Sequence, residues 1–323
     1  MEFFKRTDPI AFMFQSMRFG VLSLILVVSS WVIVTFNGLN YGIDFAGGTL
    51  IQVKYKGDAP LEEVRTLVNA SEQFSGAQVN YFGSDDEIII KTKTSSKVVG
   101  EDISDQAREV LKPTGNFEIR RVDMVGPKIG DELREKGLMA MLLAIVGILA
   151  YVSFRFEWRF GLASVLALVH DVSITMGLLS LFRIEINLDI LAALLTLLGY
   201  SLNDTIIVFD RIREGLHKLK NMELSSIIDT SVTLTLSRTT LTSLTTFFVV
   251  LSLYLFGGEI IKGFSFTLLV GIIVGTYSSI FIASPLLIWL KLSASEYQAR
   301  EAKKLQREKE KERMRAMYEK GTL

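Results

Sequence analysis

The chain has 323 residues, no net formal charge and no cysteine. Of its residues 49% are hydrophobic, and its mean hydropathy of +0.36 is too high for an ordinary soluble protein of this length. The balanced charge does not indicate a polyanionic partner, and the lack of cysteine excludes disulfides and thiolate metal sites. Its histidines, His170 and His217, are too few to favour a histidine zinc site.

Long apolar stretches are the main feature of the sequence. A membrane-spanning helix needs about 20 mainly apolar residues, and six stretches qualify. The first is longer than the apolar core of a signal peptide and no A-x-A site follows it, so we interpret it as a retained anchor. The expected spans are 17–36, 138–156, 160–182, 188–209, 239–255 and 264–290.

The basic residues of the short links predict the orientation of the spans. Lys5 and Arg6 precede the first span, and Arg211 and Arg213 follow the fourth. Because cytoplasmic links are enriched in Lys and Arg, both termini are expected in the cytoplasm. The predicted organisation is a cytoplasmic N-terminus (1–16), a first span (17–36), a periplasmic α+β domain (37–137), a bundle of five further spans (138–291) and a charged cytoplasmic tail (292–323).

The region between the first two spans is long enough for one small domain. Residues 49–55 alternate between apolar and polar, as in a half-buried strand, and Pro60 opens an amphipathic helix. Two strands joined by a turn at 83–86, a second helix and a last strand follow. The order β-α-β-β-α-β predicts a ferredoxin-like α+β domain. Its expected elements are 49–55, 60–74, 77–82, 86–93, 101–112 and 116–125.

Glycines surround this domain where it joins the spans. The motif "YGIDFAGGT" contains Gly42, Asp44, Gly47 and Gly48, and its glycines permit backbone angles that other residues avoid. It is interpreted as a tight junction or as a hinge on which the domain swings, and spacing does not separate the two. The segment "VGPKIGDELREKG" predicts a turn followed by a short helix over 131–136.

Ionisable residues inside spans cost several kcal/mol and usually face the protein interior or a water-filled path. His170 and Asp171 lie about halfway along the third expected span, and Asn203 and Asp204 lie in the fourth. Arg238 lies at the start of the fifth, which runs antiparallel to the fourth, so we predict that Asp204 and Arg238 pair. The neighbouring hydroxyl groups expected along the same path are those of Thr239, Thr240, Thr242 and Ser243.

Two interpretations of these polar residues remain open. They could form a structural ion pair that fixes helix packing. Alternatively, they form a proton relay, since a desolvated carboxyl group holds a proton and a nearby guanidinium favours its release. A movement that makes or breaks the pair would then couple proton passage to conformational change.

Motifs for other chemistry are absent. The sequence contains no G-x-x-x-x-G-K-[ST], no G-x-S-x-G and no H-E-x-x-H, so we expect no P-loop ATP hydrolysis, no enzymatic activity, no cofactor and no metal site. An ion gradient is the remaining energy source. The mixed-charge tail predicts a solvated helix, with docking on a ribosome or on anionic lipid as the alternative.

A set of motifs, in order from about Tyr41 to Pro285, resembles the SecF family of bacterial membrane proteins. They are "YGIDFAGGT", "VGPKIGDEL", "YVSFRFEWRF", "LALVHDV", "INLDILAALLTLLGYSLNDTIIVFDRIREG", "LSRTTLTSLTT", "LYLFGG" and "GFSFTLLVGIIVGTYSSIFIASPL". The resemblance implies one six-span half of an RND-type transporter, paired with SecD. It also implies a proton-path role for Asp204 and Arg238, and a less defined one for His170 and Asp171.

The resemblance also implies the setting in which the chain works. The complex would lie in the bacterial inner membrane and use the proton-motive force to complete preprotein export. It would act on preproteins at the SecY–SecE–SecG channel after SecA has started their export, with YajC and YidC as associates. Two alternatives remain: a half-size RND-type exporter of lipid or small molecules, and an aspartyl protease using Asp171 and Asp204. The second lacks the expected G-x-G-D motif.

Overall fold

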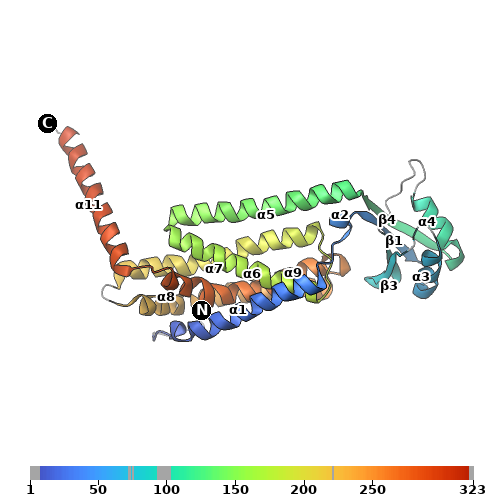
Figure 1. Ribbon diagram of the computed structural model, residues 1–323, viewed down its shortest axis with the longest axis horizontal. Coiled ribbons are helices and arrows are strands. Elements are labelled where there is room, and N and C mark those ends of the chain that lie inside the picture. The colour runs from blue at the N-terminus through green and yellow to red at the C-terminus, as the bar shows by residue number, and fades with distance from the viewer. Residues whose placement is uncertain (1–7, 72–73, 75, 93–102, 220–221, 320–323) are drawn as a thin grey trace.

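The computed structural model describes residues 8–71, 74, 76–92, 103–219 and 222–319. Figure 1 shows an elongated helical bundle with a small α+β domain at one end and the helix α11 (Ala294–Glu319) projecting from the other. The described start of α1 also lies at the end of the bundle away from the domain. We call the two ends of the bundle the domain end and the terminal end.

Among the described residues, six helical segments are long and apolar enough to cross a membrane, which confirms the six predicted spans. The last one is interrupted by a π-helical turn, η2 (Ser279–Ala283), which separates α9 from α10. The segments are α1 (Phe12–Asn37), α5 (Pro127–Arg155), α6 (Trp158–Leu181), α7 (Leu188–Lys218), α8 (Leu224–Phe256), and α9 (Glu259–Ser278) with η2 and α10 (Ser284–Trp289).

Helix α6 is the most buried span and forms the centre of the bundle, while α1 and α5 flank it and keep most of their surface exposed. At the terminal end the core includes the fully buried Phe160 and Phe209, whose rings meet edge to face at 5.1 Å. At the domain end it includes Leu179, Ile190 and Leu197. The polar site lies between these two apolar clusters.

Two helices begin earlier than the sequence pattern predicts. The short helix expected at 131–136 is instead part of α5, which runs unbroken from Pro127 because proline fits the first turn of a helix. Helix α8 begins at Leu224, ahead of the predicted residue 239. In its polar first half, hydroxyl groups such as those of Thr235 and Thr239 are satisfied within the helix, because they donate to carbonyl groups one turn back.

The domain between α1 and α5 has the predicted ferredoxin-like topology. Its antiparallel sheet has the strand order β2-β3-β1-β4, and α3 and α4 cover one face. Helix α3 ends at Ala70, before the predicted residue 74, and β3 begins at Ser84, so the hairpin turn is tighter than expected. The elements are β1 (Gly48–Tyr55), α3 (Leu61–Ala70), β2 (Gln78–Phe82), β3 (Ser84–Thr92), α4 (Ile103–Leu111), η1 (Lys112–Thr114) and β4 (Phe117–Val125).

The glycine motif packs tightly where the domain meets the bundle. It forms the short helix α2 (Ile43–Ala46), followed by Gly47 with a φ of 73°. A Cβ atom on Gly47 would lie 2.9 Å from the Cα atom of Pro127, too close for any other residue. The Asp44 carboxylate accepts a hydrogen bond of 3.0 Å from the backbone N–H of Leu188, at the start of α7. These contacts favour the tight-junction interpretation of the motif.

Candidate functional site

The predicted polar residues separate into buried and exposed groups. His170, Asp171 and Asp204 are buried, whereas Asn203 and Arg238 are exposed. Asn203 directly precedes Asp204 on α7. Its side chain nevertheless lies on a different face of the helix, because successive residues are about 100° apart. The structure therefore brings the two carboxylates into the bundle interior and leaves the amide and the guanidinium outside it.

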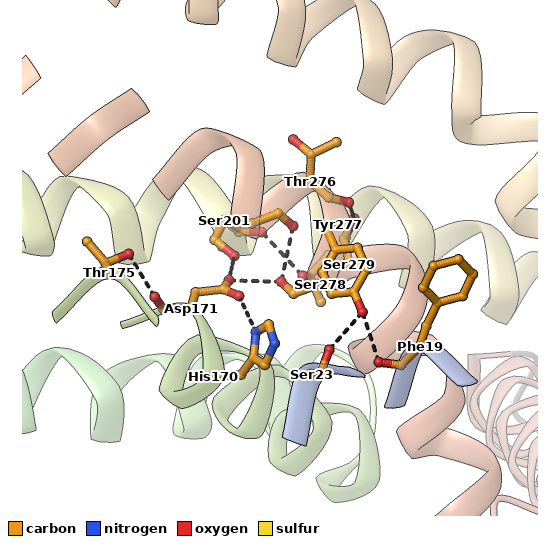
Figure 2. Close-up of polar contacts among 12 residues, drawn as sticks. Phe19, Ser23, His170, Asp171, Thr175, Ser201, Thr276, Tyr277, Ser278 and Ser279 are labelled. Atoms are coloured by element: carbon orange, nitrogen blue, oxygen red, sulfur yellow. Dashed lines mark hydrogen bonds and ion pairs between the residues drawn. The ribbon is translucent and has the colours of Figure 1, made fainter. Parts of the chain in front are cut away.

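Asp171 is the acceptor of a network that joins three spans (Figure 2). Its Oδ1 atom lies 2.9 Å from Nδ1 of His170. Its Oδ2 atom accepts hydrogen bonds from Ser201 of α7 at 2.5 Å and from Ser278 of α9 at 2.9 Å. Two serine donors and the His170 ring thus give both oxygens of this fully buried carboxylate a polar partner.

The His170 ring connects this network to α1. It stacks against Tyr277 with 6.1 Å between ring centroids. The Tyr277 hydroxyl donates to the backbone oxygen of Phe19 at 2.9 Å and lies 2.8 Å from Oγ of Ser23, as Figure 2 shows. The Nε2 atom of His170 is buried and has no hydrogen-bond partner in the part of the chain that the structure describes. One ring nitrogen of the imidazole therefore takes no part in this network.

Asp204 occupies a separate position between α7, α8 and α9. Its Oδ2 atom accepts a hydrogen bond of 3.0 Å from Ser243, and the Ser243 hydroxyl in turn accepts one of 2.8 Å from Thr276. The Oδ1 atom is buried and has no hydrogen-bond partner among the described residues. An unsatisfied buried carboxylate oxygen is costly, and a bound proton removes most of that cost.

The predicted ion pair between Asp204 and Arg238 is not formed. Arg238 lies five residues before Ser243 on α8, which turns it about 140° around the helix from the residue that contacts Asp204. The residue on the buried face at that level is Thr239, four residues before Ser243. The rotation of α8 about its axis therefore keeps the Arg238 side chain away from Asp204.

Close helix packing brings the two polar centres together. A Cβ atom on Gly275 of α9 would lie 3.0 Å from the Cβ atom of Ser201, so glycine allows Ser201 to approach. Ser201 and Asp204 are three residues apart on α7 and face the same side of that helix. Asp171 and Asp204 have different hydrogen-bond donors, an arrangement unlike a protease dyad that shares one proton.

Several site residues were missed by the sequence analysis. Ser201, Ser278, Thr276 and Tyr277 complete the networks, but serine and threonine are common in spans and gave no distinct signal. The polar run "GTYSS" within the otherwise apolar sixth span was the available clue. Among the described residues, no group of three or more His, Cys, Asp or Glu side chains has the arrangement of a metal site.

Two protein-family models match segments of this chain. Residues 94–293 match the family "Protein export membrane protein SecD/SecF, C-terminal", and residues 32–59 match the "SecD/SecF GG Motif". The second match contains the junction glycines. Fold and site thus define a protein-export membrane protein of the SecD/SecF class.

Curated relatives identify the branch of that class. The SecF protein translocase subunit of Helicobacter pylori strain 26695 is 49% identical over 321 residues, which is 99% of each chain. The SecF subunit of Escherichia coli O157:H7 is 42% identical over 275 residues, 84% of each chain. The chain belongs to the SecF family of protein translocase subunits.

Solved structures agree with this assignment. The crystal structure of the translocon-associated membrane protein SecDF from Thermus thermophilus matches with a TM-score of 0.79 and 35% identity. A structure of SecDF in its super-membrane-facing form matches with a TM-score of 0.67 and 34% identity. This chain covers 39% and 41% of those two SecDF chains, so it corresponds to less than half of each.

Proposed function

We propose that this chain is the proton-conducting half of a heterodimer with SecD, and that the pair uses the proton-motive force to complete preprotein export. SecA would start translocation through the SecY–SecE–SecG channel, with YajC and YidC as further associates. The complex would lie in the bacterial inner membrane, with both termini cytoplasmic and the small domain periplasmic. In this role the chain catalyses no covalent chemistry.

The observation that carries the proposal is the Asp204 carboxylate. It is buried in a membrane-spanning helix, one oxygen accepts a hydrogen bond from Ser243, and the other has no partner within the described ranges. A purely structural carboxylate is normally satisfied at both oxygens, as Asp171 is. The free oxygen of Asp204 is the position where a proton would bind and leave.

The exposed polar residues of α7 and α8 support a partner half. Asn203 and Arg238 have exposed side chains on membrane-spanning helices, where contact with hydrocarbon is unfavourable. A second six-span half placed against this face would bury them in a polar interface. In this proposal the observed conformation is one state of the relay. In that state the guanidinium of Arg238 faces the partner interface and does not pair with Asp204.

Asp171 and His170 would serve as a second, more strongly held element of the same relay. The free Nε2 atom of His170 can take up or release a proton, while Asp171 keeps the ring in place through Nδ1. Ser201 belongs to the Asp171 network and lies one helical turn from Asp204, so a movement of α7 changes both centres together.

The test is preprotein translocation in inverted membrane vesicles that carry SecD with either the natural chain or Asp204→Asn. SecA action is stopped before a proton gradient is applied. The expected result is that only the natural chain responds to the gradient. The matched control is Asp210→Asn, which removes an exposed carboxylate from the same helix. An equal response from Asp204→Asn and the natural chain would overturn the proposal.

A further inference from the structure

A cavity at the domain end of the bundle is not used by the polar site. It has a volume of about 310 Å³, at the lower end of the range for ligand pockets. It lies over α6, between α1 and α5, which flank that helix on either side. Its lining is almost entirely apolar and includes Trp31, Val172, Met176, Leu138 and Leu194.

The position of the cavity indicates what surrounds it. Trp31 and Leu138 border it, and both are more than half exposed on the outer surface of membrane-spanning helices. The cavity therefore opens to the side, toward hydrocarbon. Apolar cavities do not hold ordered water, and an empty one loses dispersion contacts on every wall. The component that is both adjacent and apolar is a lipid acyl chain.

One basic residue stands at the polar edge of the cavity. Arg134 lines it, one helical turn before Leu138, where the apolar part of α5 begins. A guanidinium at that level lies where the phosphate of a phospholipid would be found. Its Nη2 atom is 3.3 Å from Asp131, but both side chains are at least half exposed, so this pair is weak. Arg134 retains further donors for a phosphate.

We propose that this cavity binds one acyl chain of a membrane phospholipid whose phosphate is held by Arg134. Val172 and Met176 of α6 would contact the chain at its inner end, and Trp31 would cover its side. The bound lipid fills the space between α1 and α5 and thereby stabilises the arrangement of the two least buried spans. This inference does not depend on the proposed proton relay.

The three tryptophans of the chain provide the test. Trp158 and Trp289 lie near the terminal end of the bundle, so Trp158→Phe and Trp289→Phe together leave Trp31 as the single reporter beside the cavity. The full chain, purified with ordinary phospholipid, is mixed with excess vesicles of phosphatidylglycerol carrying brominated acyl chains, which quench tryptophan. Loosely bound lipid exchanges at once, whereas lipid in a site exchanges slowly.

We expect two phases of Trp31 quenching, the second at least about tenfold slower because exchange is limited by dissociation of the bound lipid. Val172→Phe, which fills the cavity, removes the slow phase. Val146→Phe makes the same change on the lipid-facing surface of α5 and leaves it intact. Arg134→Gln keeps the apolar walls and speeds the slow phase, whereas Arg134→Lys keeps the charge and largely restores it.

Three results would overturn the proposal: a single fast phase in the parent protein, a slow phase that survives Val172→Phe, or its equal loss in Val172→Phe and Val146→Phe. Native mass spectrometry of the unmutated chain gives a check that does not depend on any variant folding. One phospholipid retained per chain supports the site. A chain that carries no lipid, or a retained peptide in its place, contradicts it.

Discussion

Ser243 donates a hydrogen bond of 3.0 Å to Oδ2 of Asp204, and no other residue that the structure describes forms a hydrogen bond with this carboxylate. The donor comes from α8 and the acceptor from α7, so the bond joins two antiparallel spans. A single neutral donor holds the side chain in place and leaves its second oxygen available. The Asp204 side chain is therefore held in place at Oδ2, while Oδ1 remains available to bind a proton.

Replacing Ser243 by alanine should weaken this arrangement. The loss of a hydrogen bond to a buried carboxylate costs about 1.5–3 kcal/mol, so we expect lower thermal stability and a reduced response of export to the proton gradient. Ser243→Thr, which keeps a hydroxyl group, should restore most of both. The control is Ser252→Ala on the same helix, where the exposed hydroxyl bonds to a carbonyl group of its own helix. Equal effects at the two serines would contradict the prediction.

The start of α1 is held by a residue of α8, which lies far from it in the sequence. Oδ1 of Asp229 accepts a hydrogen bond of 2.8 Å from the backbone N–H of Met13, while the residue at the N-cap position, Ala11, provides no side-chain cap. Asp229→Ala should therefore cost about 0.5–2 kcal/mol, the usual value for a lost helix cap. Asp229→Asn should recover most of the loss.

Limited proteolysis near Met13, together with thermal unfolding in detergent, measures this effect. The expected result is faster cleavage in Asp229→Ala than in Asp229→Asn. Unchanged cleavage and unfolding in both variants would show that the contact with α8 does not hold the start of α1.

The junction glycine Gly47 should tolerate no side chain. Its φ of 73° places it in a region that other residues rarely adopt, and the same holds for Gly38 with a φ of 70°. Alanine at either position carries about 1–3 kcal/mol of backbone strain. At Gly47 the added Cβ atom also meets Pro127 at 2.9 Å, whereas at Gly38 it meets nothing within 4 Å.

Gly47→Ala should therefore lower the free energy of unfolding more than Gly38→Ala, by about 1–3 kcal/mol for the added crowding. Thermal unfolding of the two variants side by side measures the difference. If both lose the same amount, backbone strain alone explains the glycine, and the close contact with α5 has no energetic role.

The small domain should become less stable in acid partly through Asp86. A hydrogen bond from Ser84, and then one from Lys54, lower the pKa of this carboxyl group below its ordinary value. Because the folded pKa lies below the unfolded one, the stabilisation is complete above the unfolded pKa of about 3.9 and disappears as the pH falls through the folded pKa. Asp86→Asn should flatten this part of the stability profile.

Hydrogen exchange of the β1 and β3 amides in the full chain, followed between neutral pH and pH 3, measures that profile. Asp85→Asn is the control at the neighbouring position. The effect is expected to be small because Asp86 is at the surface and solvent screens its interactions. An unchanged profile in Asp86→Asn would assign the acid response to other carboxylates.

The sequence by itself determined the spans and the domain. Six apolar stretches of sufficient length allow few other structures, because a backbone in hydrocarbon must satisfy its hydrogen bonds within a helix. Alternation in strands such as residues 49–55 and the order of elements were enough to predict the ferredoxin-like topology. The rarity of ionisable residues in spans identified Asp171 and Asp204 as candidates before any contact was known.

Only the tertiary structure decided which side chains meet. Depth suggested that Arg238 would pair with Asp204, but the rotation of α8 brings Ser243 to the carboxylate and leaves Arg238 on the exposed surface. The serines that bind Asp171 come from α7 and α9, which are distant in sequence. Hydropathy records how deep a residue lies along its helix, whereas contact also depends on the rotation of that helix, which is set by packing against its neighbours.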